Sequence, residues 1–92
     1  MSTSKYDIFF YNEKRVIKFS KFDNFKAASE YLLANMSAYM ESEHFLSNTD
    51  SSYCATVFDV GSSRFIQLLG PIGDEEKLFL EKAFKKTGNR WL

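Results

Sequence analysis

The stretch KYDIFFYNEKRVIKFS, residues 5 to 20, has two runs of aromatic and branched residues on either side of a polar pair. These runs predict two β-strands, residues 6 to 11 and 14 to 19, joined by a turn at Asn12-Glu13. One face of this hairpin is then almost wholly apolar, with the opposite pairs Tyr6/Phe19, Ile8/Ile17 and Phe10/Arg15. The other face carries Asp7/Lys18, Phe9/Val16 and Tyr11/Lys14. Aromatic side chains are therefore expected on both faces of the first strand.

A second hairpin is predicted from SYCATVFDV, residues 52 to 60, and RFIQLLG, residues 64 to 70. Gly61-Ser62 between them suits a tight turn because glycine accepts a positive φ. One face of this hairpin would hold the pairs Ala55/Leu68, Val57/Ile66 and Asp59/Arg64. The other face would hold Cys54/Leu69, Thr56/Gln67 and Phe58/Phe65.

A helix is predicted after each hairpin. Asp23 suits an N-cap, and apolar residues then recur at helical spacing, which indicates a helix over residues 24 to 41. The polar segment SEHFLSNTDSS that follows is predicted to be a loop. Asp74 is predicted to cap a second helix over residues 75 to 87, with acidic residues in its first turn and lysines in its last, as the helix dipole favours.

The order strand, strand, helix, given twice, predicts a single domain of the α+β class over residues 1 to 92. The expected architecture is two-layered, ββαββα, with a four-stranded antiparallel sheet and both helices on one face. The sequence leaves the strand order across the two hairpins open. The sheet residues expected beneath the helices are Tyr6, Ile8, Phe10, Ile17, Phe19, Ala55, Val57, Ile66 and Leu68. The helix residues expected in the core include Leu32, Phe79 and Phe84.

If both helices cover one face, six apolar or largely apolar side chains remain on the other: Phe9, Tyr11, Val16, Phe58, Phe65 and Leu69. At about 1.5 to 2 kcal/mol for each side chain, covering them would contribute on the order of 10 kcal/mol as an upper bound. Such a patch usually marks an interface, so these six residues are predicted to bind a partner. As alternatives, Trp91-Leu92 or Phe45-Leu46 would fold back over the face, or sheet twist would shelter part of it.

No catalytic, cofactor or metal motif is recognisable. Cys54 and His44 are each single in the chain, so neither an internal disulfide nor a Cys/His zinc site can form within it. A thiol nucleophile built from Cys54, His44 and Asp50 is disfavoured, because Cys54 lies in an apolar strand and His44 in a polar loop. The turn GSSR, residues 61 to 64, lacks the Gly/Lys spacing of a phosphate-binding loop. We therefore expect no enzyme, no cofactor and no metal.

The formal net charge is zero but unevenly distributed, with six basic and three acidic residues in residues 1 to 26 and five acidic residues without Lys or Arg in residues 27 to 63. This balance argues against a general polyanion binder. The longest uncharged run, residues 31 to 40, is too short to span a membrane, and no secretory leader begins the chain. Together with the single cysteine, these features predict a soluble, cytoplasmic protein.

The function that fits these features best is a small non-enzymatic protein-binding module of the inhibitor or adaptor type. It would act through the aromatic sheet face, either as a homodimer or docked on a larger protein. The alternative is a single-stranded nucleic-acid-binding protein, since sheet aromatics beside Lys14, Lys18 and Lys21 would combine base stacking with cationic contacts. The predicted element order and aromatic pattern do not match an RNA-recognition motif, which favours the protein-binding hypothesis.

Overall fold

The computed structural model of the chain describes residues 5–39, 42–49, 52–61, 63–86 and 90–91. Within these residues the elements follow the order ββαβββαβ. They are β1 (Tyr6–Asn12), β2 (Arg15–Phe22), α1 (Phe25–Met36), β3 (Ser42–Thr49), β4 (Ser52–Asp59), β5 (Arg64–Gly70), α2 (Asp74–Lys86) and β6 (Arg90–Trp91). The predicted α+β class with an antiparallel sheet and two helices is confirmed.

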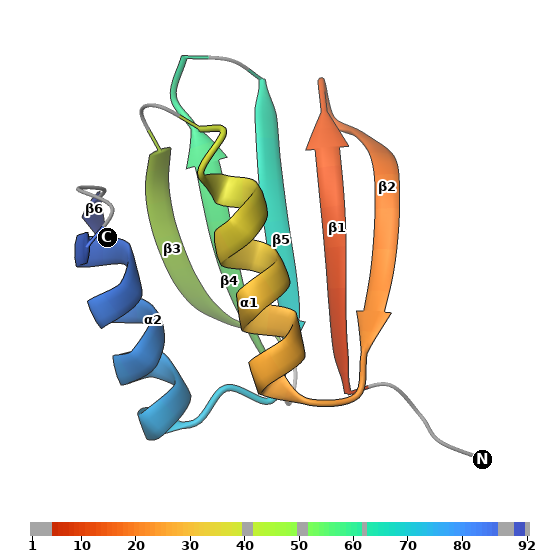
Figure 1. Cartoon of the computed structure of the whole chain (residues 1–92). Helices are drawn as coiled ribbons and strands as arrows, with labels where there is room; N and C mark the ends of the chain where they lie inside the picture. Colours follow the sequence, from red (N-terminus) through yellow and green to blue (C-terminus); the bar gives the residue numbers. More distant parts are fainter. Residues whose placement is uncertain (1–4, 40–41, 50–51, 62, 87–89, 92) are drawn as a thin grey trace.

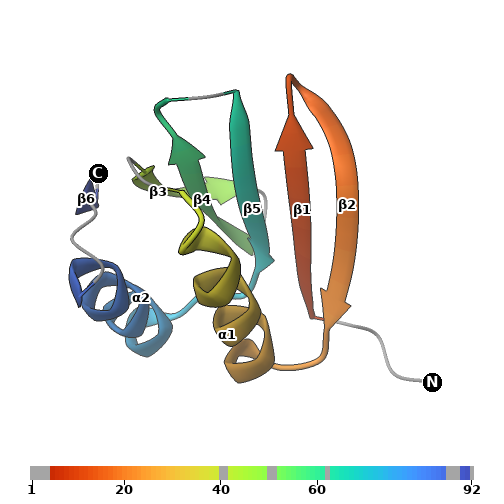
Figure 2. The same cartoon turned by 45° about the horizontal axis from the view of Figure 1, so that its top comes forward.

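The described strands form one sheet in the order β2-β1-β5-β4-β3-β6. β5 pairs antiparallel with both β1 and β4, and this pairing joins the two hairpins side by side. β6 adds two residues in parallel orientation beside Glu43 and His44 of β3. Both helices lie on the same face of this sheet (Figures 1 and 2). In the described part of the chain, the opposite face carries no helix.

The predicted four-stranded ββαββα arrangement is wrong, because the segment expected to be a loop forms strand β3. β3 pairs with β4 along its whole length, from Ser42 opposite Asp59 to Thr49 opposite Ser52. The sequence SEHFLSNT has little strand propensity of its own, so the ladder with β4 and the burial of His44 on the helix side hold it extended. Trp91, considered together with Leu92 as a cover for the face away from the helices, instead belongs to β6 at the sheet edge. Leu92 lies outside the described residues.

The second hairpin has the predicted register, from Cys54 opposite Leu69 to Phe58 opposite Phe65. Next to the Phe58/Phe65 pair, Arg64 Nη2 lies 3.0 Å from Asp59 Oδ2, and the two side chains form an ion pair. The alternation of buried and half-buried residues along β5 follows the same register, with Ile66 and Leu68 on the helix side.

The first hairpin has a different register from the predicted one. Its turn lies at Glu13-Lys14, and a β-bulge shifts the pairing from Phe10 opposite Lys18 to Tyr11 opposite Val16. Ile17 is the extra residue of the bulge. Because one inserted residue moves the following side chains to the other face, Ile17 and Phe19 do not lie in the core as predicted. Ile17 is 63% exposed, and Phe19 lies opposite Phe9 on the face away from the helices.

The helix ends depend on side chains next to the predicted caps. The N-cap of α1 is Asn24 and not Asp23, since Asn24 Oδ1 accepts a hydrogen bond from the Ala27 amide at 2.8 Å. The helix also ends at Met36, five residues before its predicted end. α2 begins at Asp74, where the Gly73 amide donates to Glu76 Oε1 at 2.8 Å, in one half of a capping box.

The core lies between the sheet and the two helices. Its fully buried side chains include Ile8, Ala55, Val57, Ile66 and Leu68 from the sheet and Ala28, Leu32, Met36, Leu80 and Phe84 from the helices. Phe79, which was expected in the core, is 47% exposed on α2. Neither α1 nor α2, the helices of the described residues, has the length and apolar character needed to cross a membrane.

Candidate functional site

The six residues predicted to bind a partner all lie on the sheet face away from the helices, here called the open face. They come from β2, β1, β5 and β4 and alternate along their strands with core residues such as Ile8 and Ile66. The face assignment survives the wrong register of the first hairpin, because Phe9 and Tyr11 keep their parity relative to the buried Ile8.

Four of the six residues, together with Phe19, form a continuous row of rings across the open face. Phe19 stacks on Phe9 with a centroid separation of 4.7 Å, and Tyr11 stacks on Phe65 at 4.3 Å with an interplanar angle of 9°. Phe9 and Tyr11, with centroids 6.3 Å apart, connect the two stacks. Phe58 extends the row beyond Phe65, also with a centroid separation of 6.3 Å. We call Phe19, Phe9, Tyr11, Phe65 and Phe58 the aromatic row.

The strand register produces this row. Phe9 lies opposite Phe19, and Phe65 lies between Tyr11 on one side and Phe58 on the other. Opposite residues of a ladder and residues two apart in one strand share a face, so their rings meet. The Tyr11 hydroxyl also donates a hydrogen bond to Gln67 Oε1 at 3.2 Å, which fixes the orientation of the Tyr11 ring.

The other two predicted residues flank the row differently. Val16 lies opposite Tyr11 and is 52% exposed, so it extends the apolar surface toward the sheet edge. Leu69 is separated from Phe65 by Gln67 on the same strand face and lies between Asp7 and Cys54. Leu69 therefore belongs to the open face but not to the aromatic row.

Two aromatic residues of the open face were not predicted there. Phe19 was placed in the core, because no feature of the sequence marks the bulge at Ile17. Phe45 lies opposite Thr56 on β3 and is 38% exposed, and it was missed because its segment was expected to be a loop. SEHFLSNT has adjacent apolar residues at Phe45 and Leu46 and no apolar alternation, so the sequence carries no signal that would have identified this strand.

The charged residues near the row nearly balance one another. Lys21 Nζ lies 3.7 Å from Asp7 Oδ1 and 5.1 Å from the centroid of the Phe19 ring. Lys18 belongs to the other face of β2, where its ammonium lies 5.5 Å from the ring centroids of Phe10 and Tyr31. Lys14, Lys18 and Lys21 therefore do not form a single basic strip beside the aromatic row.

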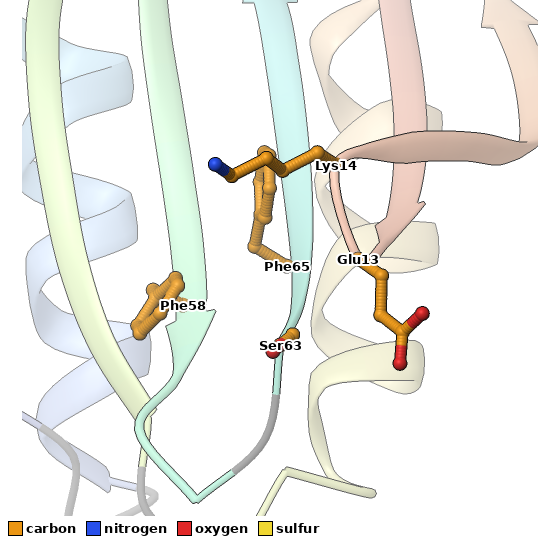
Figure 3. A pocket seen from close by; sticks show the side chains of 5 residues that line it. All are labelled: Glu13, Lys14, Phe58, Ser63 and Phe65. Atoms are coloured by element: carbon orange, nitrogen blue, oxygen red, sulfur yellow. The ribbon is translucent and has the colours of Figure 1, made fainter.

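A hollow with a volume of about 420 Å³ lies at one end of the row, lined by Glu13, Lys14, Phe58, Ser63 and Phe65. Its side chains come from the β1–β2 turn and from the β4–β5 hairpin (Figure 3). The Lys14 side chain reaches across toward Phe65, whereas the Glu13 carboxylate points away from it (Figure 3). The Glu13 amide donates to the Ser63 carbonyl oxygen at 3.0 Å and ties the two hairpin ends together.

The residues considered for a thiol nucleophile are not brought together. Cys54 is 3% exposed, and its Sγ atom lies 3.5 Å from Thr56 Oγ1 on the open-face side of β4. His44 is buried on the helix side, where its ring stacks on Phe84 at 3.8 Å. Asp50 lies outside the described residues. Among the residues that the structure describes, no group of His, Cys, Asp and Glu side chains is arranged to hold a metal ion.

Comparison of the chain with protein-family models, with curated proteins and with solved structures finds no match. Function is therefore inferred from the chain's own residues.

Proposed function

We propose that the protein is a small non-enzymatic binding module that docks on another protein surface, or on a second copy of itself, through its open face. The observation that carries this proposal is the aromatic row, five neighbouring rings, of which Phe19 is exposed and the other four are half-buried, on a sheet face that no helix covers in the described part of the chain. Exposed apolar surfaces of this kind mark interaction sites in soluble proteins.

The composition of the face supports a protein partner. Aromatic side chains are enriched among the residues that dominate protein interfaces, since they bury a large area with few rotatable bonds. The rings of the row already contact one another, so they are held in place before a partner arrives. This lowers the conformational entropy lost on binding. The ion pair between Asp7 and Lys21 leaves little net charge beside them, which suits a partner of mixed composition.

The module would act as an inhibitor or adaptor that occupies the surface of its target. A reducing cytoplasm is the proposed location, because Cys54 is the single cysteine of the chain and is buried.

Adjacent residues of β5 provide the experiment. Phe65→Asp should abolish self-association or partner binding and lower stability modestly, by about 1 to 2 kcal/mol, as two ring contacts are lost. Ile66→Asp should unfold the domain, because Ile66 is fully buried and an unpaired buried carboxylate is far more costly than a solvated one. Light scattering over a range of concentrations and thermal melts measure both variants.

Two outcomes would contradict the proposal. If Phe65→Asp unfolds the protein as completely as Ile66→Asp does, the open face is ordinary packed core. If the wild-type chain is a strict monomer that also binds no apolar dye, the open face is not an accessible surface.

A single-stranded nucleic acid remains the second candidate, favoured by the Lys21 ammonium over the exposed Phe19 ring. Two features weaken it. Tyr11 and Phe65 stack face to face, so each covers a ring face that a base would need. Lys18 lies on the opposite side of the sheet from the row.

A further inference from the structure

We propose that the hollow beside Lys14 is the anchor point of this interface, and that it takes an apolar side chain of a partner protein that has a carboxylate next to it. This inference rests on the proposed function of the open face. It adds the chemistry of the segment that the face recognises.

The hollow has the size and the walls for one large apolar side chain. Phe58 and Phe65 lie opposite each other on β4 and β5, with centroids 6.3 Å apart and ring planes inclined by 34°. The two rings form the apolar wall of the hollow, whose volume of about 420 Å³ exceeds that of any single side chain. A few side chains that fill well-packed pockets carry most of the binding energy of a protein interface.

Lys14 gives the hollow its charge preference. Its side chain extends over the hollow toward Phe65, while the carboxylate of the neighbouring Glu13 points the other way (Figure 3). Lys14 belongs neither to the ion pair between Lys21 and Asp7 nor to that between Arg64 and Asp59. A carboxylate on the partner, next to the inserted side chain, would therefore give the ammonium a counter-ion.

The turn that carries Lys14 is held in one geometry. Glu13 and Lys14 have φ values of 52° and 69°, a left-handed conformation in which Asn and Gly are the favoured residues of a two-residue hairpin turn. The bond from the Glu13 amide to the Ser63 carbonyl oxygen fixes this turn against the second hairpin. Lys14 is thus presented from a constrained backbone, and less of its freedom has to be lost on binding.

Nuclear magnetic resonance titration with two blocked dipeptides tests the inference. The probes are acetyl-Phe-Asp-amide and its uncharged control acetyl-Phe-Asn-amide, each added at millimolar concentration to isotope-labelled protein. We expect shifts concentrated at Lys14, Phe58 and Phe65, with the Asp peptide bound about two- to fivefold more tightly than the Asn peptide. Added salt should reduce that difference, since an exposed ion pair is screened.

Two variants separate the contribution of the Lys14 charge from that of the apolar wall. Lys14→Gly suits the positive φ at this position and keeps the turn, so it should remove the difference between the two peptides without unfolding the hairpin. Phe58→Ala should weaken the binding of both peptides by the same factor, because it removes an apolar wall and no charge.

The inference is overturned if the two peptides bind wild-type protein equally, if Lys14→Gly preserves their difference, or if no shifts occur at the hollow. Shifts confined to Phe9 and Phe19 would overturn the anchor position while leaving the open face as the binding surface. The proposed function itself is tested separately, by light scattering and thermal melts of Phe65→Asp.

Discussion

Tyr31 is the residue through which α1 holds the outer strand β2. Its ring centroid lies 5.1 Å from that of Phe22 and 5.9 Å from that of Phe10, and Ser20 Oγ is placed to donate to its hydroxyl at 3.5 Å. A hydrogen bond from Lys18, followed by that from Ser20, stabilises the phenolate and lowers the Tyr31 pKa below its ordinary value of 10.0. Burial is the main cause that raises the pKa values of Tyr6 and Tyr39.

These directions predict how stability changes in alkaline solution. The lowered pKa of Tyr31 contributes stability that is present above pH 10.0 and is lost as the pH falls through the folded-state pKa. Tyr6 and Tyr39 act in the opposite direction, because the stability that their raised pKa values contribute is lost as the pH rises through those values.

An ultraviolet titration of the tyrosines tests the contact between Lys18 and Tyr31. Tyr31→Phe should remove a phenol that ionises below pH 10.0, and Lys18→Met should raise the pKa of that phenol. An unchanged titration curve in both variants would contradict the Lys18 contact.

Ile66 and Ile17 are the same residue type in opposite environments. Ile66 is fully buried, whereas Ile17 is 63% exposed at the bulge. Ile66→Ala should cost about 2 to 4 kcal/mol, because burial is lost and a cavity remains. Ile17→Ala should change stability by no more than about 0.5 kcal/mol, as expected for a surface position. Urea denaturation measures both, and a larger loss for Ile17→Ala than for Ile66→Ala would show that the bulged register is wrong.

At the scale of elements, the start of α1 depends on a single side chain. Asn24 satisfies the Ala27 amide at 2.8 Å, while Asp23 precedes the cap. Asn24→Ala should therefore destabilise the domain by about 1 kcal/mol. Asp23→Ala is the matched control and should change stability by less than about 0.5 kcal/mol. Thermal melts of the two variants compare them, and equal losses would show that both side chains share the cap.

The two hairpins differ in how their registers are determined. Gly61 lies in the turn of the second hairpin. From Arg64 to Leu69 the side chains of β5 then alternate between the two sheet faces without interruption. The first hairpin turns at two residues that disfavour a positive φ, and its ladder contains a bulge at Ile17. In the second hairpin Gly61 does not adopt the positive φ expected of it, so the uninterrupted alternation of β4 and β5 determines the register. The first takes its register from packing against β5 and α1.

At the scale of the whole molecule, the cations are divided between the two faces of the sheet, with Lys14 and Lys21 beside the aromatic row and others on the helix side. The aromatic row faces away from the helices, while Lys18 and the ion pair between the exposed Arg64 side chain and the buried Asp59 lie on the helix side. A nucleic-acid interface would need cations along the same surface as the rings, to follow the phosphate backbone. This division of the cations is the physical ground for ranking a protein partner first.

The same division predicts the outcome of a nucleic-acid test. A single-stranded oligothymidylate should not bind measurably at physiological salt, as followed by fluorescence anisotropy, and a duplex of equal length is the control. Binding of the single strand that weakens steeply with salt and disappears in both Phe9→Ala and Phe65→Ala would reverse the ranking of the two functions.

The sequence by itself determined the features that depend on near neighbours. The α+β class, the existence of both helices, the register of the second hairpin and the open-face position of all six predicted site residues follow from the periodicity of apolar residues within each segment. A strand's period of two is local, so Phe65 and Ile66 must face opposite sides wherever the strand is placed.

The tertiary structure alone decided the features that depend on distant partners. β3 is a strand because β4 and the helices hold it, β5 pairs with β1 to join the hairpins, and the bulge moves Phe19 into the aromatic row. The hollow beside Lys14 needs the two hairpin ends to meet. These pairings are selected by the total burial of the sheet beneath two helices, a property that no short segment of the sequence contains.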